Sequence, residues 1–91
     1  MQQGTVAPSR QEISDWLVDW IGKEAELPRG EIQLDQSLLD YSLSSITATI
    51  LVGDIEEWLN VTLPPTLAWD YPTIGALVEF LAETVSGGHG D

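Results

Sequence analysis

The chain contains no cysteine, and this absence removes several kinds of chemistry at once. Without cysteine there is no disulfide framework, no thiolate nucleophile and no thiolate metal site. Histidine is almost as scarce, since the one His, His89, lies in the Gly-rich stretch SGGHGD at the end of the sequence. A Ser-His-Asp triad or a histidine metal site would have to be built on that tail. We therefore expect His89 to be a solvated residue without a catalytic role.

Positive charge is the second shortage. The chain has 3 Lys and Arg against 15 Asp and Glu, which gives a formal net charge of −12, and no Lys or Arg follows Arg29. A surface this acidic repels nucleic-acid backbones and anionic lipids, whereas it attracts proteins that carry basic patches. The composition therefore argues against nucleic-acid binding and favours basic protein partners.

Long apolar runs are also missing. No stretch approaches the roughly 18 residues of a membrane-spanning helix, and MQQGTVAPSR at the start lacks the apolar stretch of a signal peptide. We therefore expect a soluble cytoplasmic protein with no membrane contact. The 91 residues fit one small domain, too small for a deep catalytic cleft, but 43% hydrophobic residues are enough for a core.

Small and polar residues mark both ends of the chain as linkers. We expect flexible segments at residues 1–8 and 86–91, with one domain over residues 9–85 between them. No segment of the domain alternates as a strand does, and apolar residues recur at helical spacing. The sequence predicts an all-α fold: a small bundle of three longer helices and one short helix, with a long loop between the first and second helices.

The first helix has a clear start, because Ser9 and Glu12 form the pattern of a capping box. Pro28 should prevent the helix from continuing past Leu27. Its expected core-facing residues are Ile13, Trp16, Leu17, Trp20 and Ile21. The loop that follows, residues 27–43, is unusually long for a compact domain, and such loops are often functional. We expect its apolar residues to pin it across the helices: Ile32, Leu34, Leu38, Leu39, Tyr41 and Leu43.

The second helix should begin at Ser44 or Ser45 and run to about Asn60. At 100° per residue, its core face is predicted to hold Ala48, Leu51, Val52, Ile55, Trp58 and Leu59. Ile46 and Ile50 fall on the opposite side, close to the serines. Two large apolar side chains are thus left facing outward.

The segment LAWDY, which lies before Pro72, has room only for a short helix or turn. The last helix is expected after a cap at Thr73. Its predicted buried residues are Ile74, Leu77, Val78, Leu81 and Val85.

Ser44 and Ser45 are the candidate functional residues. The first amides of a helix are unpaired and carry partial positive charge, so a serine there either caps the helix or holds a phosphate ester favourably. The local sequence leaves both roles open. The carboxylates do not suggest an enzyme, because they lack the ligand pattern of a calcium loop, and an acid–base pair would need a cleft.

The segments YSLSSITATIL and LPPTLAWDYPTIGALVEFLA, in this order and spacing, resemble the acyl carrier protein family, especially the carrier domains of modular polyketide synthases. Such domains show Tyr-Gly-Leu-Asp-Ser and then Leu or Ile at the start of the second helix, and an aromatic-Asp-Tyr-Pro-Thr run before the last. The resemblance extends from about Ile13 to Ala82, and the run from Trp69 to Thr73 is its more specific part.

The resemblance implies that Ser45 is the attachment site of 4′-phosphopantetheine, transferred from coenzyme A by a separate phosphopantetheinyl transferase. The terminal thiol of that arm would hold acyl or polyketide intermediates as thioesters. The domain would then be a non-catalytic carrier that presents them to ketosynthase, acyltransferase and other pathway enzymes with basic docking patches. We expect the isolated domain to be monomeric.

Two residues depart from the family pattern: Ser42 replaces the usual Gly, and Ser44 replaces the usual Asp. Ser44 can cap the helix as Asp would, to within about 1 kcal/mol, but it offers no carboxylate to a transferase or its metal. Ser44 therefore stays open as an alternative attachment residue, and an unmodified docking domain of the same fold stays open as the alternative function. A peptidyl carrier is less favoured, because such domains place Gly-Gly and a polar residue where Ser42, Leu43 and Ser44 stand.

In this family the second helix is the main docking surface. The resemblance therefore gives its outward side a role: Ile46 and Ile50, beside Asp54, Glu56 and Glu57, form an apolar spot with an acidic rim that suits basic, partly apolar partners. The alternative is that Ile46 packs on the loop before the helix and Ile50 packs on a neighbouring element.

Overall fold

The computed structural model describes residues 8–41 and 43–87, except for the side chains of Leu39 and Ser86. Its α-helices are α1 (Arg10–Ala25), α2 (Ser45–Leu59), α3 (Leu67–Asp70) and α4 (Ile74–Gly87), and the 3-10 helices η1 (Arg29–Glu31) and η2 (Leu38–Tyr41) lie in the long loop. Within these residues there is no strand, which confirms the predicted all-α fold. α4 runs to Gly87, past the expected domain end at residue 85. His89 and most of the two expected linkers lie outside the described residues.

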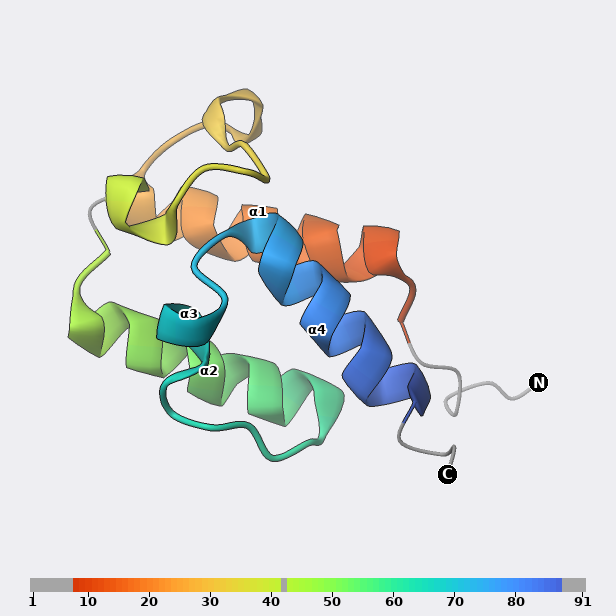
Figure 1. Ribbon diagram of the computed structural model, residues 1–91. Helices are drawn as coiled ribbons and strands as arrows, with labels where there is room; N and C mark the ends of the chain where they lie inside the picture. The colour runs from red at the N-terminus through yellow and green to blue at the C-terminus, as the bar shows by residue number, and fades with distance from the viewer. Residues whose placement is uncertain (1–7, 42, 88–91) are drawn as a thin grey trace.

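α1 packs against α4, and α2 packs against α3 (Figure 1). The loop that carries η1 and η2 closes one end of the bundle and leads directly into the start of α2. None of the helices in the described part of the chain is long and apolar enough to cross a bilayer.

Each long helix begins at a side-chain cap, as the sequence predicts. At α1, the Glu12 amide donates to Ser9 Oγ over 3.1 Å, and the Glu12 carboxylate accepts from the Ser9 amide over 2.8 Å. At α4, the Ala76 amide donates to Thr73 Oγ1 over 3.1 Å. α1 ends at Ala25, and the chain turns away through Glu26 in the left-handed conformation. These local bonds explain why the helix starts could be predicted from short sequence patterns.

One apolar core joins all four helices. Its largest fully buried side chains are Ile13, Leu17 and Ile21 of α1, Leu51 and Ile55 of α2, Leu67 of α3, and Ile74, Leu77 and Leu81 of α4. No polar or charged residue is buried among those that the structure describes. The predicted core positions of α1, α2 and α4 are therefore largely correct.

The tryptophans are less buried than the sequence predicts. Trp58, expected in the core, is 36% exposed, while Trp16 and Trp20 are only partly buried. The rings of Trp16 and Trp58 stack with their centroids 4.7 Å apart and 5° between their planes. Trp20 Nε1 donates to an oxygen of Asp54 over 2.7 Å. The indoles thus connect α1 to α2 at the edge of the core, because they are long enough to reach past it. Leu59 and Val85, also predicted for the core, are partly buried.

The long loop is pinned by both apolar and polar contacts. Four of its predicted anchors are buried: Ile32, Leu38, Tyr41 and Leu43. Leu34 is 46% exposed, so its side chain is not an anchor, but its carbonyl accepts from the Gly75 amide over 2.8 Å. The Leu38 amide donates to the Pro72 carbonyl over 2.7 Å. These backbone bonds fasten the loop to the chain entering α4.

Ion pairs gather on α1. Arg10 forms two hydrogen bonds of 3.0 Å with the carboxylate of Glu79 in α4, and the hydrogen bond from Arg10 lowers the pKa of Glu79. Arg29 pairs with both Asp15 and Asp19. Two of the three basic residues are therefore engaged away from α2.

Of the three glycines Gly22 in α1, Gly53 in α2 and Gly75 in α4, two have a packing reason and one does not. A Cβ added at Gly22 would lie 3.0 Å from the Leu27 carbonyl oxygen, and one at Gly75 would lie 3.3 Å from the Leu34 carbonyl oxygen. At Gly53, in the middle of α2, no atom lies within 4 Å of the added Cβ. A glycine inside a helix costs about 0.5–1 kcal/mol relative to alanine. No contact within the described fold offsets that cost at Gly53.

We predict that Tyr41→Phe lowers the free energy of unfolding by about 1–2 kcal/mol in urea denaturation. The buried Tyr41 hydroxyl accepts from the Gln33 amide over 2.8 Å and lies 3.2 Å from both the Gln33 carbonyl and Gln36 Oε1. Phenylalanine leaves these groups without their partner. The control is Tyr71→Phe, since the Tyr71 hydroxyl has no hydrogen bond within the described residues. Equal effects of the two substitutions would contradict a pinning role for Tyr41.

Candidate functional site

The start of α2 assigns different roles to the two adjacent serines. Ser44 is the N-cap: its Oγ accepts from the Thr47 amide over 3.1 Å and lies 3.0 Å from Thr47 Oγ1. Its carbonyl accepts the first helical hydrogen bond, from the Ala48 amide, over 2.9 Å. The Ser44 hydroxyl is therefore occupied by holding the helix start. The prediction of a helix start at this point is confirmed.

Ser45 is the first residue of α2, and its side chain is exposed. Its hydroxyl has no hydrogen bond with any described residue, although its carbonyl accepts from Thr49 Oγ1 over 2.9 Å. The first turn of α2 contains no acidic residue. The Ser45 oxygen thus lies free at the positive end of a helix, with no carboxylate in that turn to repel an anion.

The outward side of α2 is apolar next to the serines. Ile46 is 73% exposed and Ile50 is 53% exposed, so neither packs on the loop or on a neighbouring element. At about 100° per residue, Gly53 and Glu57 continue the same row along the helix. Ile46, Ile50, Gly53 and Glu57 together form the outward row of α2. The two isoleucines face outward as the sequence indicates, and the alternative, in which Ile46 and Ile50 pack inward, is wrong.

The three acidic residues of α2 are not equivalent. Asp54 accepts from the Trp20 indole, and Glu56 Oε2 accepts from the Leu63 amide over 2.7 Å, so both are partly buried and take part in the fold. Glu57 is exposed and forms no hydrogen bond or ion pair with the described residues. α2 itself contains no Lys or Arg. Its acidic charge is therefore left for the solvent or for a partner.

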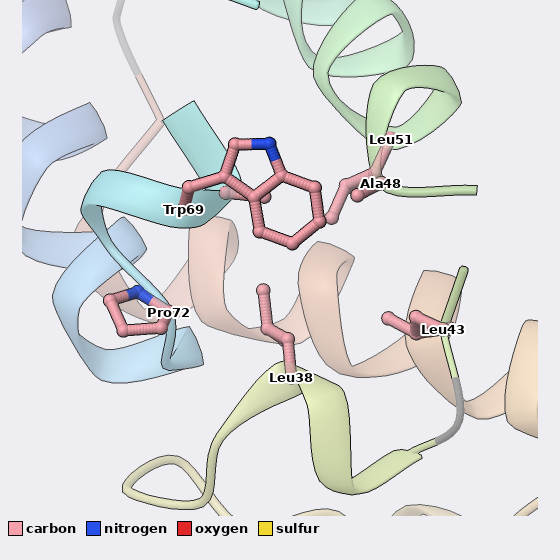
Figure 2. A pocket seen from close by; sticks show the side chains of 7 residues that line it. Leu38, Leu43, Ala48, Leu51, Trp69 and Pro72 are labelled. Atoms are coloured by element: carbon pink, nitrogen blue, oxygen red, sulfur yellow. The ribbon is translucent and has the colours of Figure 1, made fainter. Parts of the chain in front are cut away.

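An apolar pocket lies beside the helix start (Figure 2). Its volume is about 110 Å³, and its lining residues are Leu38, Leu43, Ala48, Leu51, Ala68, Trp69 and Pro72. Leu43 and Ala48 flank Ser45 in the sequence, and Trp69 reaches from α3 toward Ala48 and Leu51. Trp69 is 47% exposed. The sequence offered no sign of this pocket, because its walls come from separate segments that meet only in the folded chain.

The chain is similar to a known family and to known proteins. Residues 15–81 match the family described as "Phosphopantetheine attachment site". Over 71 residues, or 78% of the chain, it is 35% identical to a phenolphthiocerol/phthiocerol polyketide synthase of Mycobacterium tuberculosis. The matched region is 4% of that synthase, so the chain spans only a small part of this relative.

Solved structures of two carrier proteins have the same fold. One is a free-standing peptidyl carrier protein from Acinetobacter baumannii, with 36% identity, a TM-score of 0.80, and coverage of 86% of this chain and 98% of that one. The other is an acyl carrier protein from Anabaena sp. PCC 7120 with a variant phosphopantetheinylation-site sequence, with 34% identity, a TM-score of 0.80, and coverage of 92% and 97%. The similarity thus extends to acyl and peptidyl carriers alike.

The family match covers most of the chain, and the helical fold agrees with it. The chain belongs to the phosphopantetheine-attachment family and is a non-catalytic carrier domain, of the kind found in polyketide synthases and free-standing carrier proteins, whose members carry 4′-phosphopantetheine covalently.

Proposed function

We propose that Ser45 is the attachment residue of this carrier domain, and that the domain holds acyl intermediates for the enzymes of a polyketide pathway. The observation that supports this most is the contrast between adjacent hydroxyls. Ser44 Oγ is engaged by the Thr47 amide, whereas Ser45 Oγ is exposed and unbonded within the described chain. Substitution of the free hydroxyl leaves the cap of the helix in place, whereas substitution of Ser44 Oγ would disturb it.

The residues around Ser45 fit a phosphate ester. The helix start supplies amides with partial positive charge, and its first turn has no acidic side chain. When bound, the prosthetic group supplies a flexible arm with a terminal thiol that carries acyl groups as thioesters. Ser45 would hold the ester, while Ser44 keeps the helix start in place through the Thr47 amide.

Attachment requires a separate enzyme. In the transfer, Ser45 Oγ forms a bond to the phosphorus of coenzyme A next to pantetheine, the bond from that phosphorus to 3′,5′-ADP breaks, and 3′,5′-ADP leaves with the electron pair. The serine proton must pass to a base. No described side chain hydrogen-bonds to Ser45 Oγ and could take it. We propose that a partner transferase supplies the base.

Ser44 in place of the usual Asp is compatible with this role. It provides the cap that Asp would provide, although it brings no carboxylate. The similar Anabaena carrier also has a variant phosphopantetheinylation-site sequence. We therefore propose that Ser44 changes which transferase works well on the domain, and that Ser45 remains the acceptor.

The outward row of α2 suits enzymes that bind a carrier domain only briefly. Ile46 and Ile50 offer a small apolar contact, and Glu57 offers an unpaired negative charge next to it. Asp54 and Glu56 add to the negative field but are held by Trp20 and by the Leu63 amide. We propose that phosphopantetheinyl transferase, ketosynthase and acyltransferase dock here through basic, partly apolar patches. Such electrostatic docking favours fast encounter and short-lived complexes.

The apolar pocket suits the apolar end of a short acyl chain. Its volume of about 110 Å³ is smaller than the roughly 150 Å³ cavity that admits a benzene ring. We therefore propose that only a few carbon atoms of the cargo enter it, between Leu38 and Trp69. Longer or polar cargo would stay outside.

We predict that incubation with coenzyme A and a broad-specificity phosphopantetheinyl transferase adds the mass of one phosphopantetheine group to the wild-type domain and none to Ser45→Ala. Ser44→Ala is the matched control. It should still gain the group, and its thermal midpoint should fall because loss of an N-cap costs about 1 kcal/mol. Intact mass spectrometry measures the first effect and circular dichroism the second. A mass gain on Ser45→Ala, or none on the wild type, would refute the assignment.

We predict that the emission of Trp69 responds to the length of the loaded acyl chain. Loading a butyryl group should shift the emission to shorter wavelength relative to the unacylated arm, because the chain excludes water from one face of the indole. The contribution of Trp69 is isolated by subtracting the spectrum of Trp69→Phe, which keeps the other three tryptophans and their contacts between α1 and α2. Ala48→Leu, which fills the pocket wall, should abolish the shift. An identical spectrum for arm and butyryl arm would show that the pocket does not receive the cargo.

A further inference from the structure

We propose that the Ser44 hydroxyl donates a hydrogen bond to the phosphodiester of the prosthetic arm once Ser45 carries that arm. This inference rests on the proposed function, because it takes Ser45 as the attachment residue. It goes further by giving Ser44 a second role. Besides capping α2, the Ser44 side chain holds the root of the arm.

The cap of α2 uses the oxygen of Ser44 as an acceptor and does not use its hydrogen. A serine hydroxyl has one hydrogen to donate and two lone pairs with which to accept. Ser44 Oγ accepts from the Thr47 amide over 3.1 Å. Its other contact within the described residues is with Thr47 Oγ1 at 3.0 Å, in which either hydroxyl can be the donor.

This pair of hydroxyls has one hydrogen more than its contacts use. Ser44 and Thr47 each supply a hydroxyl hydrogen, and the contact between them needs only one of the two. Neither hydroxyl donates to any other described residue. When Thr47 donates to Ser44, the hydrogen of Ser44 is left for an acceptor outside the folded chain.

A phosphodiester on Ser45 places such an acceptor next to Ser44. The reason to expect a phosphate there is the family match over residues 15–81, not the helix end itself. Consecutive Cα atoms are about 3.8 Å apart, so the phosphate oxygens of an ester on Ser45 come within reach of the Ser44 hydroxyl. The unesterified oxygens of a phosphodiester share a negative charge, and hydrogen bonds to charged oxygens are about twice as strong as neutral ones.

The start of α2 offers few other donors for this phosphate. The Thr47 amide donates to Ser44 Oγ, and the Ala48 amide donates to the Ser44 carbonyl. The amides of Ser45 and Ile46 have no acceptor within the described chain, and they are present whatever residue precedes Ser45. Ser44 adds the nearest side-chain donor, which is exposed, and the first turn holds no acidic residue that would compete for it.

An aspartate at position 44 would have the opposite effect on the phosphate. Its carboxylate caps a helix about as well as a serine hydroxyl does, but it has no hydrogen to donate and adds a negative charge beside the ester. Exchanging Ser44 for aspartate therefore leaves the cap in place and changes only how much the attached arm stabilises the domain. The variant Ser44→Asp should fold, which makes it useful in a test.

The test compares the Tm of the apo and holo forms of each variant by circular dichroism. The measured quantity is the change in Tm on attachment, because the effect of a substitution on the cap is present in both forms and cancels. We expect this change to be about 2–6 °C less favourable in Ser44→Ala than in the wild type, and less favourable still in Ser44→Asp. Holo forms are made with coenzyme A and a broad-specificity transferase, and intact mass confirms full modification.

Two threonine variants form a matched pair. Thr47→Val removes the hydroxyl that contacts Ser44 and keeps the Thr47 amide, so attachment should stabilise this variant less than the wild type. Thr49→Val removes a hydroxyl that donates to the Ser45 carbonyl and does not contact Ser44, so its change in Tm should stay within about 1 °C of the wild-type value. The phosphorus NMR resonance of the arm should move in Ser44→Ala and stay in place in Thr49→Val.

The outcomes separate this inference from the proposed function. If the wild-type domain is not modified, or is modified on Ser44, the assignment of Ser45 fails. If Ser45 is modified but Ser44→Ala and Ser44→Asp show the wild-type change in Tm, the attachment stands and the role of the Ser44 hydroxyl is wrong. Equal effects of Thr47→Val and Thr49→Val, or an unmoved phosphorus resonance in Ser44→Ala, would also overturn the inference.

Discussion

The hydrogen bond from the Thr47 amide to the Ser44 hydroxyl fixes the point at which α2 begins, and the function proposed for the domain depends on that point. Because Ser44 caps the helix, Ser45 becomes its first residue and keeps an unbonded, exposed hydroxyl. The same register directs Ile46 and Ile50 outward, and places Ala48, Leu51 and Ile55 in the core. A helix that began one residue later would occupy the Ser45 hydroxyl with capping.

The rest of the structure holds this helix start in place. The long loop enters α2 through Tyr41 and Leu43, which are both buried, and its backbone is fastened to the segment before α4 by the bonds from Leu38 to Pro72 and from Gly75 to Leu34. On the other side, α2 is tied to α1 by the Trp16–Trp58 stack and by the bond from Trp20 to Asp54. A small domain without disulfides therefore presents a free hydroxyl at a helix start that is held by contacts on two sides.

The features that could be predicted from sequence are those that depend on neighbours in the chain. Ser9, Ser44 and Thr73 cap helices through bonds that span three residues, so short patterns indicate them. Burial at helical spacing is equally local. Exposure of Trp58 was missed, because a large side chain at the edge of a core face lies partly outside it. The prediction that the Leu34 side chain anchors the loop is wrong, because the loop is fastened through the Leu34 carbonyl. The engagement of Asp54 and Glu56 depends on Trp20 and on the Leu63 amide, which lie in other segments.

At the candidate site, too, features set by neighbouring residues could be predicted, whereas those set by distant segments could not. The sequence alone left Ser44 and Ser45 both open, and the resemblance to acyl carriers selected Ser45. The geometry supports that choice on separate grounds, through the occupied and the free hydroxyl. The pocket beside them could not be predicted, since residues from η2, α2, α3 and the approach to α4 form it together.

The central claim is that the free hydroxyl, and not the capping one, is the acceptor. It is tested most directly by locating the phosphopantetheine group on the wild-type chain, by fragmentation mass spectrometry of the modified peptide. The account predicts that every fragment carrying the group includes Ser45 and that fragments containing Ser42 and Ser44 without Ser45 are unmodified. A group located on Ser44 would contradict it.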